Sequence, residues 1–397
     1  MLLMLNFNKS FTVYFYFFVC FSGLTYYTVF DGIFIRYSEI RVAYIIIAFA
    51  LSFMFLAYLK KYKASSAFVS FIFLILYGIV LAFAHKYFQS GAELIRFILY
   101  LNIYLILFNT NIEVNFVKIC QIISAIGVVM YVISYGQELN SSFRVTGNTA
   151  SVMGYASLVY TSYLIMLILI RERTDRDKMK LSILPLLAVV ASGSRSILFI
   201  QVMTFVIAYF HNNNINFQKY LFKIIKSTLI LIILFTVTYF STNIFYRFEI
   251  LLSGSMLVDT STSFRIMIVN TVIDNLNEFL ITGIGLGSFP LWFEAKTGLA
   301  DVAPHSEFIW LLVEFGIVGI LVYSAFLYFA YKKSSRKNIL VIIFVLLQVI
   351  PLHFANSFYF YQVGMLQFAF LGYLHRKKCT ADYNLPDVVR IQKKVIS

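Results

Sequence analysis

The chain alternates between long apolar runs and short, mostly basic polar segments along almost its whole length. A helix that crosses a bilayer needs roughly 20 apolar residues, and runs near this length recur throughout. A short polar interruption at Ser192 to Ser196 separates the seventh run from the eighth. The pattern predicts an all-α polytopic membrane protein that forms a single domain over residues 1–397. We expect about twelve spans, at residues 11–30, 42–59, 67–84, 94–109, 115–134, 150–170, 181–193, 196–210, 227–242, 307–330, 339–356 and 358–374.

The composition agrees with this pattern and excludes several classes of protein. Hydrophobic residues make up 60% of the chain and charged residues 13%, with a mean hydropathy of +0.83. Soluble domains carry about a quarter charged residues, so neither a soluble enzyme nor a disordered chain is expected. Lys9 precedes the first apolar run and no small-residue cleavage site follows it, which predicts an uncleaved first span. The three cysteines (Cys20, Cys120 and Cys379) form no metal-binding or disulfide pattern.

The basic residues predict the orientation of the chain. With twelve spans, the loops on one side hold 23 lysine and arginine residues, those on the other hold eight, and Arg96 falls inside a span. The richer side should be cytoplasmic, which places both termini in the cytoplasm and the long segment 243–306 on the outer side. The net charge of +14 is spread over short clusters with no basic stripe between aromatics, so nucleic acid is not an expected partner.

Three arginines are unusual for a passive membrane protein. Arg96 lies inside the fourth span, whereas Arg144 and Arg195 lie in outer loops, where the orientation rule disfavours them. Ionisable residues at membrane depth are functional candidates. Arg96 could instead form a local pair with Glu93, three residues earlier, and reach the interface. Contact with lipid headgroups is the alternative for the other two.

The outer segment predicts one amphipathic helix over residues 264–280. Placing residues at 100° steps gathers the apolar side chains on an arc of about 200°, and Arg265 falls near its middle. A guanidinium on such a stripe needs an anion or acceptor, and its two-pronged geometry suits phosphate. Alternatively, Arg265 bends back to water from the first turn.

A glycine-rich segment and a histidine follow this helix. Gly283-Ile-Gly285-Leu-Gly287 lacks the surrounding βαβ unit of a nucleotide-binding loop, so we expect a turn that directs the chain back toward the membrane. Pro304 favours a helix start, which places His305 in the first turn at the outer interface, where it could accept a proton or serve only as a polar anchor. Glu314 lies roughly 13 Å deeper and should need a proton or a cationic partner. Gly316 and Gly319 should allow close helix packing. Trp292 and Phe293 are candidates for stacking on sugars.

The order and sidedness of these features resemble the Wzy-type O-antigen polymerases and the related O-antigen ligases. The matching pieces are Ser194-Arg195 between two spans, Phe264-Arg265-Ile266 in a large outer loop, the glycine-rich segment, and His305-Ser306 before a span with Glu314-Phe-Gly316. Coverage is strongest over residues 190–320. Ser306 departs from the pattern, because the family often has Asn there, and Arg144-Val-Thr-Gly-Asn148 is a looser match.

The resemblance implies a GT-C-like glycosyltransferase of the bacterial inner membrane, without metal or cofactor, whose site faces the periplasm. Its donor and acceptor would be undecaprenyl-diphosphate-linked oligosaccharides, and a chain-length regulator would be a further partner. By carry-over, Arg195 and Arg265 would bind the donor diphosphate and His305 would activate the acceptor hydroxyl. Arg144 and Arg96 are additional diphosphate candidates, and Glu314 is a candidate supporting acid.

Two alternatives to a polymerase stay open. An O-antigen ligase, which moves the glycan onto lipid A–core, shares most of these motifs. A flippase for lipid-linked oligosaccharides should show two similar halves, whereas here one oversized outer loop precedes the tenth span.

The orientation can be tested by labelling single cysteines from outside whole cells. We expect Thr260→Cys to react and Asp175→Cys to stay protected, because the basic residues place segment 171–180 in the cytoplasm. Labelling at position 175 without labelling at 260 would reverse the topology.

Overall fold

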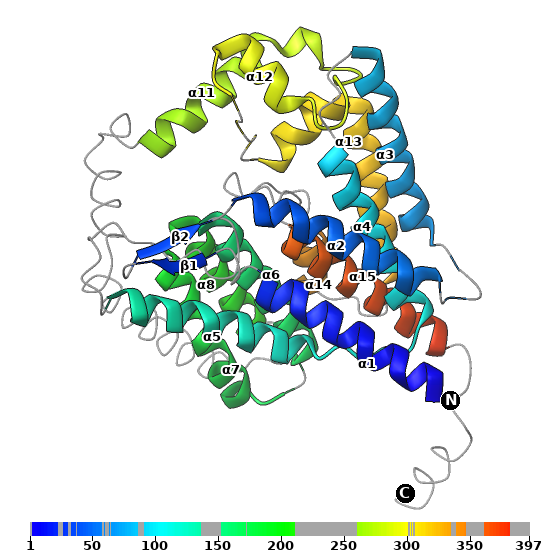
Figure 1. Cartoon of the computed structure of the whole chain (residues 1–397), viewed down its shortest axis with the longest axis vertical. Coiled ribbons are helices and arrows are strands. Elements are labelled where there is room, and N and C mark those ends of the chain that lie inside the picture. Colours follow the sequence, from blue (N-terminus) through cyan, green and yellow to red (C-terminus); the bar gives the residue numbers. More distant parts are fainter. Residues whose placement is uncertain are drawn as a thin grey trace, which may run out of the picture.

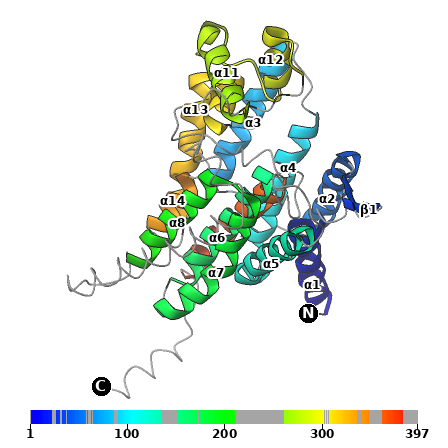
Figure 2. The ribbon, with the colours of Figure 1, turned by 90° about the vertical axis from the view of Figure 1, so that its left-hand side faces the viewer.

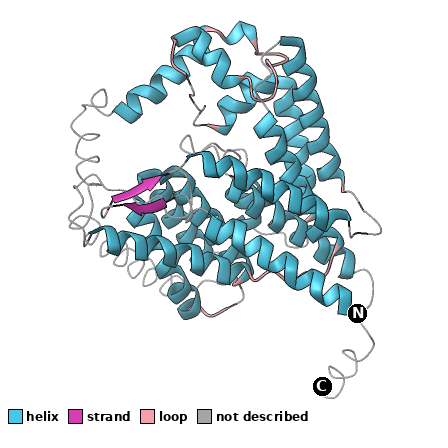
Figure 3. Cartoon of the chain, in the orientation of Figure 1, coloured by secondary structure: helices cyan, strands magenta, loops and turns pink. Residues whose placement is uncertain are grey.

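The computed structural model of the chain describes residues 2–22, 27–30, 33–36, 38–57, 66–85, 91–135, 152–171, 173–210, 260–300, 306–334, 339–346 and 361–381, and the single residues 59, 63, 65, 302 and 304. These residues are almost entirely helical, with one β-hairpin (Figure 3). The elements are α1 (Leu2–Tyr16), η1 (Phe17–Phe21), β1 (Tyr27–Phe30), β2 (Ile33–Arg36), α2 (Ser38–Ala57), α3 (Ser66–His85), α4 (Gly91–Asn109), α5 (Phe116–Tyr135), α6 (Val152–Leu169), α7 (Asp175–Ser192), α8 (Arg195–Phe210), α11 (Thr260–Asp274), η4 (Leu276–Glu278), α12 (Phe289–Thr297), α13 (Glu307–Lys333), α14 (Ile339–Leu346) and α15 (Tyr361–Ala381).

Most of the expected spans coincide with these helices. The fourth span, at 94–109, corresponds to α4 (Gly91–Asn109), and the seventh and eighth correspond to α7 and α8 on either side of a two-residue turn. Two described helices, Ser66–His85 and Phe308–Lys333, are long and apolar enough to cross a membrane, and further apolar helices are shorter. The ninth span, at 227–242, lies outside the described residues. The count of twelve spans therefore stays a prediction.

The position that the sequence predicted for the first span is wrong. Helix occupies Leu2–Phe21, as α1 and the π-helical η1, rather than 11–30. The antiparallel strands β1 and β2 follow it, with Phe30 paired to Ile33 and Tyr27 to Arg36. The segment Tyr-Thr-Val-Phe-Asp31-Gly32-Ile-Phe-Ile-Arg carries a hairpin signal, an Asp-Gly pair between β-branched and aromatic residues, which its high hydropathy concealed.

The bundle has a packed centre and, on its outside, exposed apolar helix faces. Helices α6 and α15 are buried on nearly every side, whereas α3 exposes Phe73, Val80 and Phe83 by 62–65% and buries Phe71 and Leu74. Large apolar side chains gathered on one exposed helix face mark a surface that contacts another apolar medium. Helix α3 packs along α13, and α15 packs along α4 (Figures 1 and 2). This arrangement is that of a membrane protein.

Residues 260–300 form a compact unit, here called the cap, at the end of the bundle where α13 begins. In Figure 1, α11 and α12 lie at the top of the molecule, above α13, and the upper end of α3 reaches the same height as α12. The cap and the first turns of α13 share a small hydrophobic core, separate from the bundle core, made by Ile268, Val272, Phe279, Ile284, Phe289, Trp292, Phe293, Val302, Ile309 and Val313. The expected helix 264–280 is thus a shorter α11 followed by the single turn η4. The segment 243–259 lies outside the described residues.

Helix α13 is interrupted at Gly316, which adopts φ 62° and ψ −166°. This conformation is essentially restricted to glycine. A continuous helix would join the Ile317 N–H to the Val313 carbonyl and the Val318 N–H to the Glu314 carbonyl. Gly316 breaks both bonds, so four backbone groups in the middle of an apolar helix need other partners. The expectation that Gly316 serves close helix packing is therefore corrected.

The segment 280–285 supplies all four partners. The Ile284 and Gly285 N–H groups donate to the carbonyls of Val313 and Glu314 at 2.9 and 2.8 Å. In return, the N–H groups of Ile317 and Val318 donate to the carbonyls of Leu280 and Ile281 at 2.9 and 3.2 Å. Irregular backbone at membrane depth is tolerated only when protein satisfies its polar groups, and here the cap does so. The expected turn of the glycine-rich segment is confirmed as the part of the cap that enters the bundle.

Replacing Gly316 by alanine should destabilise the protein more than replacing Gly298. Both glycines have positive φ, but a Cβ on Gly316 would lie 2.4 Å from the Ile281 carbonyl oxygen, whereas a Cβ on Gly298 meets nothing within 4 Å. We expect Gly298→Ala to cost about 1–2 kcal/mol and Gly316→Ala at least about 3 kcal/mol. Thermal unfolding of the detergent-purified variants measures both losses. Equal losses would contradict the close backbone pairing between the segment 280–285 and the break in α13.

Candidate functional site

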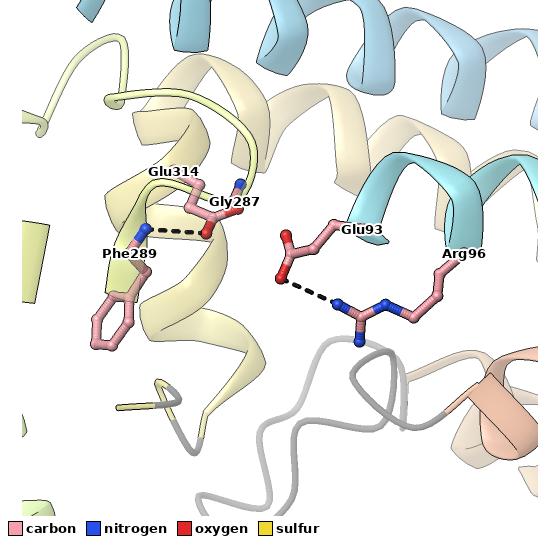
Figure 4. A network of polar contacts seen from close by, with 5 residues as sticks. All are labelled: Glu93, Arg96, Gly287, Phe289 and Glu314. Atoms are coloured by element: carbon pink, nitrogen blue, oxygen red, sulfur yellow. Dashed lines mark hydrogen bonds and ion pairs between the residues drawn. The ribbon is translucent and has the colours of Figure 1, made fainter. Parts of the chain in front are cut away.

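Glu314 lies at the centre of the polar groups between the cap and the bundle. Its side chain is 1% exposed, and its two carboxylate oxygens accept separate hydrogen bonds from the N–H groups of Gly287 at 2.8 Å and Phe289 at 3.2 Å (Figure 4). The Trp310 side chain forms a further hydrogen bond with the carboxyl group. The sequence led us to expect a proton or a cation beside this acid. Main-chain N–H groups lie beside it, because the glycine-rich segment folds back onto α13, and the expected proton on the carboxyl group stays a prediction.

Glu93 and Arg96 form the ion pair that the sequence offered as an alternative. The Arg96 guanidinium donates to a Glu93 carboxylate oxygen at 3.2 Å, and the two side chains are 8% and 15% exposed. Arg96 therefore does not reach the interface from its place in α4. The other Glu93 oxygen is buried and has no hydrogen-bond partner within the described part of the chain, and the carboxyl group lies on the side of Glu314 (Figure 4). Because Glu93 balances its charge, Arg96 is a weaker candidate for an anion than an unpaired arginine would be.

Arg195 is the first residue of α8, whereas the sequence placed it in the turn just before that helix. Helix α7 ends at Ser192, Gly193 follows with φ 65°, and Ser194 is 2% exposed. The Ser194 N–H donates to the Ser192 hydroxyl at 3.3 Å, which closes the turn. Arg195 thus stands at the N-terminus of α8, directly after this turn, and the positive end of a helix favours anions.

Arg265 lies in the first half of α11, on the edge of the apolar stripe. Ile268 and Val272, one and two turns further, are buried in the core of the cap. Ile266 and Ile273, on the neighbouring face, are 42% and 61% exposed. The single apolar arc is thus divided into a buried half and an exposed half, and the half-buried Arg265 sits at their boundary. Arg265 therefore belongs to the part of α11 that borders the core of the cap.

The remaining candidates fall on or beside residues that are not described. His305 and Arg144 lie outside the described residues. The residue after His305 is described: Ser306 is the N-cap of α13, is 3% exposed, and its hydroxyl accepts from the Ile309 N–H at 3.4 Å. Helix α13 begins at Glu307, as the expected span 307–330 does, but position 305 precedes the N-cap, so the expectation that it belongs to the first turn is corrected.

Trp292 and Phe293 are structural, which corrects their candidacy for sugar stacking. They are 1% and 0% exposed and belong to the core of the cap. The Trp292 indole donates to Glu278 at 2.9 Å, and Lys296 forms an ion pair with the same carboxylate. The hydrogen bond from Lys296, together with that from Trp292, lowers the pKa of Glu278 below its ordinary value. These contacts tie α12 to η4 at the exposed side of the cap.

The sequence analysis did not select one buried polar residue on α8. Gln201 is 0% exposed, and neither its amide nitrogen nor its amide oxygen has a hydrogen-bond partner among the described residues. A buried amide without partners costs several kcal/mol, which is typical of sites that a polar molecule fills. A glutamine inside an apolar run was the available signal, although periodicity alone gives no reason to select it. Elsewhere in the described part of the chain, no three His, Cys, Asp or Glu side chains group together as metal ligands.

Comparison with known proteins adds one finding. Residues 181–324 match the family described as O-antigen ligase. The matched stretch begins in α7 and ends in α13, so it contains Arg195, Arg265, His305 and Glu314, whereas Arg96 and Arg144 lie before it. No curated protein and no solved structure matches the chain.

Proposed function

We propose that this membrane protein, which carries an O-antigen ligase domain over residues 181–324, polymerises undecaprenyl-diphosphate-linked oligosaccharide repeat units into O-antigen polysaccharide. The domain match carries the proposal, because it implies an enzyme that transfers glycosyl groups and gives no support to a flippase. Within the matched residues, a turn arginine, a cap arginine and a histidine before the N-cap of α13 provide the groups that such a transfer needs.

In the proposed reaction, a hydroxyl of the acceptor glycan attacks the anomeric carbon of the donor sugar. A glycosidic bond forms, and the bond from that carbon to the diphosphate oxygen breaks, which releases undecaprenyl diphosphate. His305 takes the hydroxyl proton, and Arg195 and Arg265 hold the leaving diphosphate. Guanidinium groups suit this task because they stay charged and bind phosphate through two parallel hydrogen bonds. They thereby serve the role that a divalent cation has in other transferases.

The proposal also places the enzyme and its partners. We assign it to the bacterial inner membrane, with a GT-C-like arrangement, both termini in the cytoplasm and the cap in the periplasm. Lipid-linked oligosaccharides would reach the site from the bilayer, and a chain-length regulator would be a further partner. The position of the cap at one end of the bundle, opposite the Lys332-Lys333 end of α13, supports this orientation (Figure 2).

An O-antigen ligase is the second candidate, because that is the description of the matching family. A gel of lipopolysaccharide from a deletion strain separates the two. Loss of a polymerase should leave single repeat units on the core, whereas loss of a ligase should leave bare core and lipid-linked polymer. The second pattern would overturn the polymerase proposal.

Replacing Arg265 by lysine should impair activity almost as much as replacing it by alanine. Lysine keeps the charge but loses the two-pronged geometry that fits a diphosphate. A charged hydrogen bond contributes about 1.5–3 kcal/mol, so we expect a loss of about ten- to a hundredfold. Chain length on gels at matched expression measures the effect, with Arg173→Lys in the exposed turn before α7 as the control. Normal chain length in both Arg265 variants would show that the Arg265 side chain extends to water and does not bind the diphosphate.

His305→Ala should abolish the polymer ladder while the protein stays in the membrane. A positioned base contributes about 10²–10⁴-fold, and binding of the diphosphate should survive because the arginines provide it. Wild-type activity should also fall toward acid pH, because a protonated imidazole can no longer act as a base.

Polymerisation of purified lipid-linked repeat units across pH compares the two proteins. His85→Ala, at the exposed end of α3, is the matched control and should keep the wild-type rate. Long chains made by His305→Ala at a comparable rate would remove His305 from the reaction.

A further inference from the structure

Three alternate N–H groups of the segment 285–289 converge on one residue of α13. The Gly285 N–H donates to the Glu314 carbonyl at 2.8 Å, and those of Gly287 and Phe289 donate to its two carboxylate oxygens at 2.8 and 3.2 Å. Gly285 and Gly287 have φ of 106° and 73°, which allows their N–H groups to point to the same side. A Cβ on Gly285 would lie 2.1 Å from the Ala82 backbone nitrogen, so the segment also passes close to α3.

Glu314 acts as the N-terminal cap of α12 from a distance. Ser288 is the N-cap residue by position, but its side chain makes no capping bond and donates instead to the Ile284 carbonyl at 3.0 Å. Pro290 brings no N–H of its own. The Glu314 carboxyl group therefore satisfies the free N–H at the start of α12.

Both Glu314 oxygens are occupied by groups that only donate. A carboxyl group keeps acceptor lone pairs on both oxygens in either protonation state, so both N–H groups can donate to it. Among the described contacts, both Glu314 oxygens are committed to main-chain N–H groups of one segment. This arrangement is suited to holding structure.

We infer that Glu314 is a positioning residue, whose carboxylate fixes the segment 283–289 and α12 against the first turns of α13 and so sets the outer end of that helix, next to position 305. The inference rests on the proposed function for its catalytic consequence. It replaces the earlier expectation of a supporting acid. The first turns of α13 are within reach of this effect, because Ile309 and Val313 share the cap core with Ile284 and Phe289.

The test compares Glu314→Gln, Glu314→Ala and Glu278→Gln in the purified full-length protein in lipid nanodiscs. Glutamine offers one acceptor oxygen and one donor group, so it can satisfy only one of the two N–H groups, whereas alanine satisfies neither. Glu278 is the other hydrogen-bonded carboxylate of the cap, and its bonds lie at the exposed side.

Amide hydrogen exchange reads the positioning directly. We expect exchange in the segment 284–290 to rise by about tenfold or more in Glu314→Gln, and further in Glu314→Ala, with α11 unchanged in both. Glu278→Gln should leave this segment as in the wild type. Wild-type exchange in Glu314→Ala would overturn the inference.

The rate of polymerisation provides the second measurement. Glu314→Gln should lose kcat by about ten- to a hundredfold with little change in KM, and the acid limb of its pH profile should keep its midpoint. Two outcomes would show acid or base chemistry and overturn the positioning role. One is loss of a limb of the pH–rate profile in Glu314→Gln. The other is a reduced polymerisation rate in Glu314→Gln while amide exchange in the segment 284–290 stays as in the wild type.

Glu314→Asp covers the case in which the glutamine variant is not recovered in the membrane. Aspartate keeps the charge and both acceptors on a shorter side chain, so exchange and rate should both lie between wild type and alanine. A wild type that makes no polymer but transfers glycan to lipid A–core would overturn the polymerase proposal alone. The transfer rate then replaces the polymerisation rate, and the exchange measurement still decides whether Glu314 holds the segment.

Discussion

Backbone groups inside an apolar environment need hydrogen-bond partners, and the break in α13 makes this requirement acute. Gly316 leaves two N–H groups and two carbonyls without helical partners. Each such group would cost several kcal/mol if it faced lipid. The segment 280–285 satisfies all four through four backbone hydrogen bonds of 2.8–3.2 Å. The cap is thus joined to the bundle by main-chain pairing rather than by side-chain contacts alone.

This pairing explains the glycines and the buried acid together. Gly283 and Gly285 approach the backbones of α13 and α3 so closely that a Cβ would lie 2.5 Å from the Glu314 carbonyl and 2.1 Å from the Ala82 nitrogen. Once the segment lies there, the N–H groups of Gly287 and Phe289 still face α13 without backbone acceptors. A carboxylate supplies two acceptors and no donor, which is why an acid fits a place where a cation would not. The acidic side chain at the start of α12 is therefore a consequence of how the segment is bound.

The sequence predicted much of the bundle because hydropathy and polar interruptions act locally. The turn at Gly193-Ser194, the start of α13 after Pro304 and the pair of Glu93 with Arg96 involve neighbouring residues, so spacing alone indicates them. The first span was misplaced because aromatic and β-branched residues serve a hairpin as well as a membrane helix.

The break and the Glu314 contacts could not be read from the sequence. Glu-Phe-Gly316-Ile-Val-Gly319 has the spacing of small residues at a helix interface, and nothing in it indicates a left-handed glycine. The partners of Glu314 are main-chain N–H groups 25 and 27 residues earlier, and every residue except proline has one. Trp292 and Phe293 were misassigned for a related reason, because their aromatic character suits a sugar platform and a cap core equally.

The two arginines proposed to hold the diphosphate belong to different cores, which gives the segment 283–289 a further consequence. Arg195 begins α8 two residues before Ile197, which lies in the bundle core, whereas Arg265 lies on α11, whose Ile268 belongs to the cap core. Within the segment, Ile284 and Phe289 pack into the cap core, and Leu286 between them packs into the bundle core and donates its N–H to the Gly78 carbonyl at 2.9 Å. The distance between the arginines therefore depends on the segment 283–289, which packs into both cores and is hydrogen-bonded to Glu314. In the proposed function both arginines hold one diphosphate, and this segment is the part of the chain that joins the two cores from which they come.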